Sequence, residues 1–445
     1  MRLRDTSLRD SRLREACRIA FSFFALSLGA AMLVGCCENA HAAEPSREQF
    51  SVLVIAPELP HVVDVSATAE QLADSGGKPE KLSREIPQSA NTSPAAVAAA
   101  AGDAPATAEQ VDALGEKVRR VLDRYYARKQ NVDRRTPWEV MHWAVAFGTD
   151  TYLNRGAAGE DVTAIGWLGW NGRCKGQSLL YVDAKGRLGV QKGPGVQGHD
   201  GQLLAIYAQS RIRSDYPLRA SGKMFTVADL IDFEQRTCEP GSELTFKLIA
   251  LSHYLPLDAT WPDDQNRTWS VERLIREELA QKVIGAACGG THRLTGLSYA
   301  VHKAQATGEP LAGEFARAEK FIREYHRYTW TLQNADGSFS TDYFRNRAAS
   351  SDVARRLETT GHTLEWLAYS LPADELKQNR CVRAVDYLAD ILLAEPDRDW
   401  HMGGLGHGLH ALAIYEQRTA AQWKPQRPTQ EVAGTDTKHD DVNGK

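Results

Sequence analysis

Long hydrophobic runs are nearly absent from this sequence of 445 residues. The one run that approaches membrane length covers residues 19–35, so a protein with several membrane spans is excluded. An excess of either charge is also missing, because 53 Lys and Arg residues stand against 57 Asp and Glu residues. This balance excludes a generally basic protein that coats nucleic acid, and no nucleic-acid partner is expected. The length suffices for one large domain or for two or three ordinary ones.

The N-terminal segment is typical of an export signal. Residues 1–18 carry six arginines, the uncharged run 19–35 follows, and residues 40–42 (AHA) fit a signal-peptidase site. Residues 33–36 (LVGC) also resemble a bacterial lipobox, which would place a lipid anchor on Cys36 instead. A third alternative is an uncleaved anchor helix. All three predict a bacterial protein exported to the periplasm or cell envelope, which touches the membrane only through an N-terminal anchor if lipidated or uncleaved.

Composition divides the chain into four parts. Residues 1–42 are the signal peptide or lipoprotein leader, and residues 43–110 are rich in Ala, Ser, Gly, Pro and Glu. Such a segment buries too little apolar surface to offset the entropy of ordering it, which predicts a disordered tether. Residues 421–445 are equally polar and predict a disordered tail. The folded domain is therefore expected at residues 111–420.

Apolar helical segments recur through this domain. Six of them begin with small or capping residues, at 136–148, 196–209, 241–256, 289–303, 359–372 and 404–415. Their spacing is typical of helical-hairpin repeats, and their apolar character on most sides predicts an inner layer. Charged, amphipathic segments suited to an outer layer lie between them, for example 111–130, 226–237, 269–287, 313–333 and 377–395. The sequence therefore predicts an all-α fold, an (α/α)6 toroid of inner and outer helices.

One stretch departs from the helical pattern. Residues 162–197 have β character, and a turn at 183–186 joins two alternating strands into a hairpin. Because this insertion leads directly to His199, we expect it at the rim of the toroid, as a lid over its mouth. A hairpin remote from any site is the alternative.

The segment 325–339 (YHRYTWTLQNADGSF) resembles the Gln-x3-Gly-x-aromatic motif of the terpenoid cyclase and prenyltransferase toroid superfamily. Gln333, Asp336, Gly337 and Phe339 carry the resemblance, and it implies the α/α-toroid fold. The Asp-x-Asp-Asp acid of the triterpene cyclases and the Asp-x-Cys zinc motif of the protein prenyltransferases are both missing. Isoprenoid chemistry is therefore the weakest expectation. By analogy, other toroids outside the cytoplasm process or bind polysaccharides, which fits an exported protein better.

A ring of polar residues is expected where the inner helices begin. Counted from the probable caps, the third position holds Glu139, His199, Thr245, His292, His362 and His407. Parallel inner helices would bring these residues to one funnel mouth, with His199, His292, His362 and His407 as catalytic acid/base groups and Glu139 and Thr245 as binding residues. The positive helix ends favour an anionic ligand and neutral imidazoles. The alternative is that each histidine only caps or packs against its own helix.

The other candidate ligand contacts are aromatic. Trp167 and Trp170 precede the hairpin, where an indole face could stack on a sugar, or could simply plug a loop end. We expect no metal and no other cofactor, because the toroid bore could hold the ring residues too far apart and no His-x-x-x-His pair exists. Asp200 and Glu365 could orient neighbouring imidazoles.

Four cysteines follow the leader: Cys174, Cys238, Cys288 and Cys381. An even number in an exported protein permits disulfides. Cys238 and Cys288 each precede an inner helix, and these two helices are consecutive, which predicts a Cys238–Cys288 bridge.

Three functions remain open from the sequence. The first is an enzyme that acts on an anionic or polymeric carbohydrate through the histidine-lined funnel. The second is a non-catalytic binding or scaffold protein of the cell envelope, and the third is an isoprenoid-handling toroid. The expected partner is an anionic small molecule or a polysaccharide.

Overall fold

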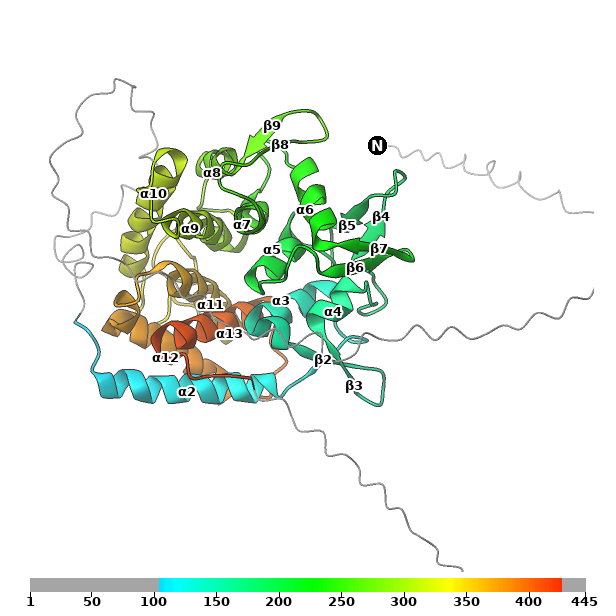
Figure 1. Ribbon diagram of the computed structural model, residues 1–445. Helices are drawn as coiled ribbons and strands as arrows, with labels where there is room; N and C mark the ends of the chain where they lie inside the picture. Colours follow the sequence, from blue (N-terminus) through cyan, green and yellow to red (C-terminus); the bar gives the residue numbers. More distant parts are fainter. Residues whose placement is uncertain (1–103, 426–445) are drawn as a thin grey trace, which may run out of the picture. The chain divides into compact units, whose positions relative to one another are not determined.

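Helices dominate the part of the chain that the structure, a computed structural model, describes, which is residues 104–425 (Figure 1). Twelve α-helices and four small sheets lie within these residues. The helices fall into two sets that alternate along the sequence. The predicted leader and most of the predicted tether and tail lie outside the described residues. The all-helical class predicted from the sequence is confirmed as a mostly helical fold with small sheets.

The first set consists of apolar helices that are buried on most sides. Its members are α3 (Pro137–Phe147), α5 (Gln202–Gln209), α7 (Thr245–Tyr254), α9 (Thr291–Gln305), α11 (Val353–Ser370) and α13 (Met402–Thr419). Each of these helices packs against the next one of the set, from α3 to α5 and on to α13. Helix α13 also packs against α3, so that helices from the two ends of the described chain lie side by side. We call this set the inner helices.

The second set consists of helices that each cover inner helices, and all of them except the short, apolar α4 are amphipathic. Its members are α2 (Ala108–Tyr126), α4 (Ala164–Gly169), α6 (Val227–Arg236), α8 (Val271–Leu279), α10 (Gly313–Thr331) and α12 (Asn379–Ala394). In α8, Val271, Leu274, Ile275 and Leu279 are buried while Glu272 and Arg276 face solvent, as the apolar spacing predicted. We call this set the outer helices.

Short strands link inner helices to outer helices. The sheets are β1–β2–β3 (Gln130–Asn131, Tyr152–Arg155, Glu160–Thr163), β4–β5 (Leu180–Val182, Leu188–Val190), β6–β7 (Pro217–Ala220, Lys223–Thr226) and β8–β9 (Thr260–Pro262, Thr268–Ser270). β1 is parallel to β2, and all other strand pairs are antiparallel. β3, β7 and β9 run directly into α4, α6 and α8. Thr163 and Ser270 cap their helices, since each hydroxyl accepts from a backbone N–H three residues later.

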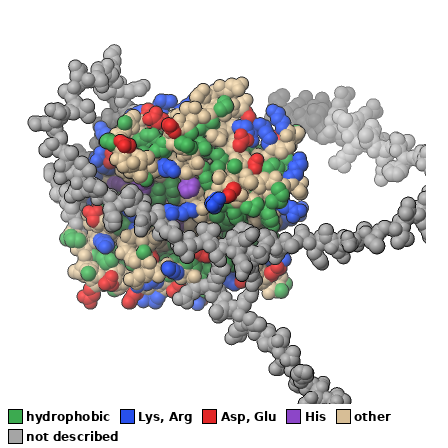
Figure 2. Space-filling model, in the orientation of Figure 1, with side chains coloured by type: hydrophobic (Ala, Val, Ile, Leu, Met, Phe, Trp, Pro, Cys, Tyr) green, Lys and Arg blue, Asp and Glu red, His purple; other side chains and the backbone are tan. Residues whose placement is uncertain are grey.

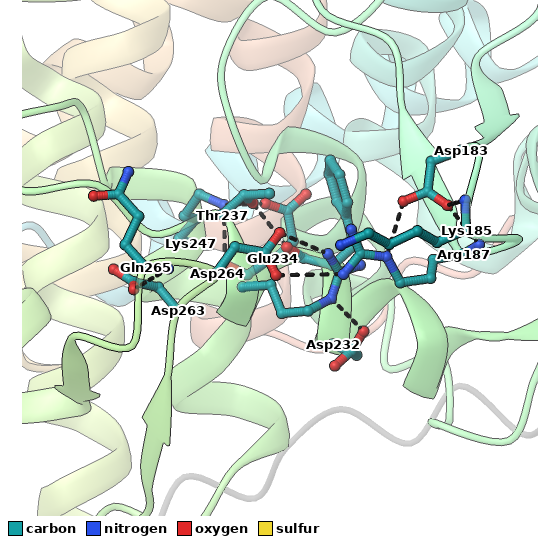
Figure 3. A network of polar contacts seen from close by, with 12 residues as sticks. Asp183, Lys185, Arg187, Asp232, Glu234, Thr237, Lys247, Asp263, Asp264 and Gln265 are labelled. Atoms are coloured by element: carbon teal, nitrogen blue, oxygen red, sulfur yellow. Dashed lines mark hydrogen bonds and ion pairs between the residues drawn. The ribbon is translucent and has the colours of Figure 1, made fainter.

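Two hairpin tips use the same Asp-x-x-x-Arg arrangement. Asp183 accepts from two backbone N–H groups of its turn and from the guanidinium of Arg187, and Asp263 does the same with Arg267. Asp264, next along the chain, bridges Arg187 to the outer helix α6 through ion pairs. Figure 3 shows this network joining the β4–β5 tip, the β8–β9 tip and α6. The tips are therefore tied to the outer layer.

The predicted hairpin forms, with its turn at the predicted residues, but it lies elsewhere than expected. β4 contacts β6, and β5 contacts α6. Among the described residues that line the central cavity introduced below, none comes from 162–197. The expectation of a lid over the mouth is thus corrected: the ion pairs and strand contacts hold the hairpin against the outer helices.

The predicted Gln-x3-Gly-x-aromatic segment forms a tight turn after α10. The side-chain amide of Gln333 donates to the carbonyl oxygens of Gly337 at 3.0 Å and Arg380 at 2.8 Å, which fastens this turn to the first residues of α12. Gly337 has φ +91°, and a Cβ at this position would lie 2.4 Å from the Arg383 carbonyl oxygen. The turn therefore requires glycine.

The ends of the described chain pack onto the helices. Residues 104–110, assigned from the sequence to the tether, already contact the chain near α12: the Ala106 N–H donates to the Lys377 carbonyl, and α2 begins at Ala108. At the other end, the Trp423 ring lies against Tyr126 and Phe147. Within the described residues, no helix combines the length and hydropathy needed to span a membrane.

Candidate functional site

Five histidine rings form one cluster inside the inner helices. His292 is central, with ring centroids 5.3 Å from His199, 5.4 Å from His362 and 5.2 Å from His407. The rings of His362 and His407 are 4.0 Å apart, and His142 lies 5.3 Å from His407. The four histidines predicted from the sequence therefore lie together, and the structure adds His142 as a fifth.

The reason for the convergence differs from the predicted one. His292 is the second residue of α9, but His362 and His407 lie within α11 and α13, and His199 precedes α5. The shared third position from a cap is therefore wrong, because α11 begins at Val353 and α5 only at Gln202. Convergence arises from the packing of the inner helices and not from a common distance to their N-termini.

The cluster is also drier than predicted. His142, His292, His362 and His407 are all buried, and only His199 is partly exposed. A ring at a wet funnel mouth was expected from the sequence. On the face drawn in Figure 2, basic and acidic side chains are interspersed, and histidine is visible only in small patches.

Four of the five imidazoles are held through Nδ1. The acceptors are the carbonyl oxygens of Trp138 for His142 and Glu358 for His362, and the carboxylates of Glu243 for His199 and Glu365 for His407, each at 2.7 Å. A neutral imidazole that donates through Nδ1–H carries its lone pair on Nε2. The cluster thus presents acceptor nitrogens without a proton of their own.

Some of these nitrogens have no partner. Both ring nitrogens of His292 are buried without a hydrogen bond within the described residues, and so is Nε2 of His407. A buried polar atom left unpaired costs about 1–3 kcal/mol. Such atoms in a native site point to a bound group that completes them.

Burial keeps three histidines of the cluster uncharged. Burial, followed by the proximity of His407, lowers the pKa of His142 to about 3. The same causes hold the pKa values of His292 and His362 well below 6.5. These imidazoles are therefore neutral near pH 7, as the sequence analysis expected, although desolvation and not a helix end is the main cause.

Glu365 is the buried carboxylate of the site. It accepts from His407 and also from Nδ1 of His410, at 2.5 Å. Burial alone would raise its pKa, but the electrostatic interaction with His407 and the two hydrogen bonds hold the pKa of Glu365 well below the usual range. Glu365 thus partners imidazoles, as predicted, but those of α13 and not His362 on its own helix.

A cavity of about 30 Å³, room for one or two water molecules, adjoins the cluster. All six inner helices contribute to its wall, which combines imidazoles with apolar and amide side chains: Met141, His142, Val145, Gln202, Ile206, Gln209, Phe246, Ile249, His292, Thr295, Glu365 and His407. A larger hollow of about 310 Å³, lined among others by Glu243, Lys282 and Arg293, borders the partner of His199. Only this hollow reaches the lower end of the range for small-molecule sites.

The predicted binding residues Glu139 and Thr245 lie outside the cluster. The carboxylate of Glu139 accepts from the backbone N–H of Thr136 at the start of α3 and pairs with Arg135. The hydroxyl of Thr245 donates to the buried carboxylate of Glu278, which belongs to the outer helix α8. Both residues stabilise helix starts, and neither lines the cavity.

Trp167 and Trp170 are likewise placed away from the cavity. Both belong to the α4 region, where the Trp167 ring packs over Gly172 and against Arg155. The Trp170 side chain is exposed. Because neither residue is among those that line the cavity, the expected sugar stacking has no support at this site.

All four cysteines of the described residues are free. The predicted Cys238–Cys288 bridge is therefore not formed. Cys238 is buried at the end of α6, where its thiol lies 3.3 Å from the Glu234 carbonyl oxygen, whereas Cys288 adjoins the histidine cluster. Burial raises the pKa of the Cys288 thiol to about 12, so it is protonated in the free protein and is no ready nucleophile.

Three participants were missed or misjudged from the sequence: His142, Glu243 and Cys288. His142 follows Trp138 by one helical turn, and the two rings lie 3.9 Å apart. That i, i+4 spacing places both on one face of α3 and could have revealed it. Glu243 and Cys288 lie in loops, where spacing carries no such signal.

Comparison with known proteins adds no relative: the chain matches no family model, no curated protein and no solved structure. The function is therefore argued from the site itself.

Proposed function

We propose that this protein is an exported, envelope-associated enzyme that acts on an anionic carbohydrate by acid/base chemistry in a histidine-lined cavity. The proposal includes the architecture, an (α/α)6 toroid, and export through the N-terminal leader. The leader lies outside the described residues, so export rests on residues 1–42 of the sequence.

Two observations support the toroid. The six inner helices pack each against the next, and α13 returns to α3, which is the circuit that a closed ring requires. One cavity also takes wall residues from all six of these helices, as an axial cavity would. The amphipathic outer helices supply the second layer.

The observation that carries the enzymatic proposal is the pair of carboxylate–imidazole dyads. Glu365 holds Nδ1 of His407, and Glu243 holds Nδ1 of His199. An imidazole oriented by a carboxylate through Nδ1 is an effective general base at Nε2, since the carboxylate stabilises the imidazolium that forms. Nε2 of His407 has no competing partner in the described residues.

The hollow beside Glu243 suits one sugar unit or the end of a chain, whereas the cavity at the histidine rings holds only one or two water molecules. The hollow has a volume of about 310 Å³, which is small for a polymer. Because Glu243 is the partner of His199, a sugar bound in the hollow would lie beside one of the two dyads. The exposed Lys282 provides positive charge for an anionic group, since the guanidinium of Arg293 is already paired with Glu278.

The second candidate is a non-catalytic binding protein of the envelope. The burial of four of the five rings favours it, because buried side chains fill the centre of a helical ring without any need for turnover. Such a protein would bind its ligand without changing it chemically.

One experiment separates these proposals. The protein purified after export is incubated with uronic-acid monosaccharides and oligosaccharides, with binding followed by calorimetry and turnover by new reducing ends and unsaturated products. We expect turnover, reduced about 100-fold or more in His407→Gln, because general-base catalysis contributes about 10²–10⁴-fold. His253→Gln is the matched control, since His253 lies outside the cavity wall and its pKa is lowered by burial too. Binding without turnover favours the second candidate, and absence of both contradicts the substrate class.

A further inference from the structure

Two groups of side chains with metal-binding atoms share His292. In the first group, one ligand atom each of Cys288, His292 and His362 lie within 4.8 Å of one another. In the second group, the same holds for His199, Glu243 and His292. We expected no metal from the sequence, because the bore could have separated the histidines. The structure removes that objection.

The two groups differ in whether their atoms are already satisfied. In the second group, Nδ1 of His199 donates to Glu243 at 2.7 Å, so these two residues partner each other. His292, neither of whose buried nitrogens has a partner in the described part of the chain, belongs to both groups and does not distinguish them. The difference is Cys288 in the first group, whose Sγ forms no hydrogen bond with the described residues. This free thiol favours the first group.

His362 is oriented as a metal-binding histidine is. Its Nδ1 contacts the Glu358 carbonyl oxygen at 2.7 Å, which fixes the ring and leaves Nε2 with the lone pair. A metal-ligating histidine almost always donates its other N–H to a carbonyl or carboxylate in this way.

The backbone before α9 holds the thiol in place. Cys288 has φ +47° and ψ +39°, and the glycines 289 and 290 that follow also have positive φ. The left-handed conformation is strained for cysteine, and such strain persists only where the surroundings impose it. Here Tyr343 packs so closely that a Cβ on Gly289 would lie 2.0 Å from its ring.

We propose that Cys288, His292 and His362 bind one zinc ion. A thiolate with two imidazoles is a donor set that suits Zn²⁺, and three protein ligands leave a fourth position open for water or substrate. Binding releases the thiol proton of Cys288 to solvent, and both imidazoles bind as neutral ligands. This site goes beyond the proposed function, because zinc binding does not depend on which reaction the cavity performs.

The test measures the metal and not activity. The full exported chain is stripped with EDTA, loaded with ZnCl₂, desalted and analysed for zinc, and we expect about one zinc per chain. In parallel, Co²⁺ replaces zinc, and a thiolate-to-cobalt charge-transfer band is expected. Cys288→Ser should abolish this band and raise the zinc dissociation constant about 100-fold or more, since even a residue behind the ligands contributes 10–100-fold.

Each substitution of a proposed zinc ligand is compared with the same substitution at a residue outside the site. Cys381→Ser removes a buried cysteine in α12 and should keep both zinc and the cobalt band. His362→Gln should lose zinc, whereas His326→Gln, which alters a histidine held by Ser370 outside the cluster, should keep it. Circular dichroism confirms that each variant folds. A parent chain without zinc, or a Cys288→Ser variant that keeps the band, overturns the proposal. Loss of zinc in Glu243→Gln but not in Cys288→Ser assigns the ion to the second group and also overturns it.

Discussion

At the scale of single residues, each histidine of the cluster has its own anchor. Carbonyl oxygens hold His142 and His362, carboxylates hold His199 and His407, and His292 has no hydrogen-bonding partner in the described structure. Substitutions of the anchors should therefore have separable effects on stability.

Glu365→Gln should strongly destabilise the fold. The carboxylate accepts from both His407 and His410, and an amide can offer an oxygen to only one of them while its NH₂ group faces the other N–H. We expect the free energy of unfolding to fall by about 3 kcal/mol. Urea unfolding measures it, with Glu395→Gln as the control, since Glu395 forms only a half-exposed ion pair with Arg398. Equal stability of the two variants would contradict the role of Glu365.

Acid should destabilise the protein below pH 6.5. The pKa of His142 is lowered to about 3 in the folded chain, and those of His292 and His362 are also far below 6.5, the value of an unfolded histidine. As the pH falls below 6.5, the unfolded chain takes up protons that the folded chain refuses. The free energy of unfolding therefore falls by up to about 1.4 kcal/mol per pH unit for each such histidine.

Urea unfolding between pH 7.5 and 5.0, in EDTA so that bound metal does not contribute, measures this slope. His142→Gln removes one titrating group and should make the slope shallower. An unchanged slope would show that the pKa of His142 is not lowered in the folded protein.

The sequence predicted most of the cluster histidines but not where their helices begin. Four cluster histidines could be found from the sequence because each lies in or next to an apolar helical segment. The position of each histidine within its helix could not be predicted. The start of α11 at Val353 and of α5 at Gln202 depends on tertiary packing and not on the caps chosen from the sequence. Counting from Thr136 therefore selected Glu139, where the structure uses His142 one turn later.

At the scale of elements, close approach of helices depends on single glycines. A Cβ on Gly406 in α13 would lie 2.2 Å from the carbonyl oxygen of His142 in α3. Backbone cannot yield as a side chain can, so Gly406→Ala must separate α13 from α3.

Gly406→Ala should lower the free energy of unfolding by about 2 kcal/mol, as overpacking of a core does, and should move His142 away from His407. Gly115→Ala in α2 is the control, because only the flexible Arg119 lies within 4 Å of the added Cβ. Alanine favours a helix over glycine by up to about 1 kcal/mol, so the control should be unchanged or more stable. Thermal and urea unfolding compare the two, and equal stability would argue against the tight α3–α13 contact.

The helices were largely predictable from the sequence, but three of the four sheets were not. Inner and outer helices were recognised because runs of 8–19 residues show the apolar spacing of a helix. The strands β2, β3, β6, β7, β8 and β9 have only three or four residues each, too few for an alternating pattern to stand out. One signal was available: Asp263 and Arg267 repeat the spacing of Asp183 and Arg187, which form the tip of the predicted hairpin.

At the scale of the whole molecule, export is the feature that the described residues leave to experiment. We expect the native protein to begin at Cys36, if lipidated, or at Ala43, if cleaved after residue 42. Mass spectrometry of the N-terminal peptide from the envelope fraction decides between them. An intact Met1 in a soluble cytosolic fraction would contradict export.

The contact between α3 and α13 also sets an order of assembly. A chain that crosses a membrane N-terminus first delivers α3 about 250 residues before α13, yet the two helices must pack together. The cavity cannot be completed until the last helix arrives, because every inner helix contributes to its wall. Contacts so distant in sequence form late, so the apolar face of α3 stays uncovered until α13 is available. A ligand of the cavity would then bind only finished molecules and would report the completion of folding.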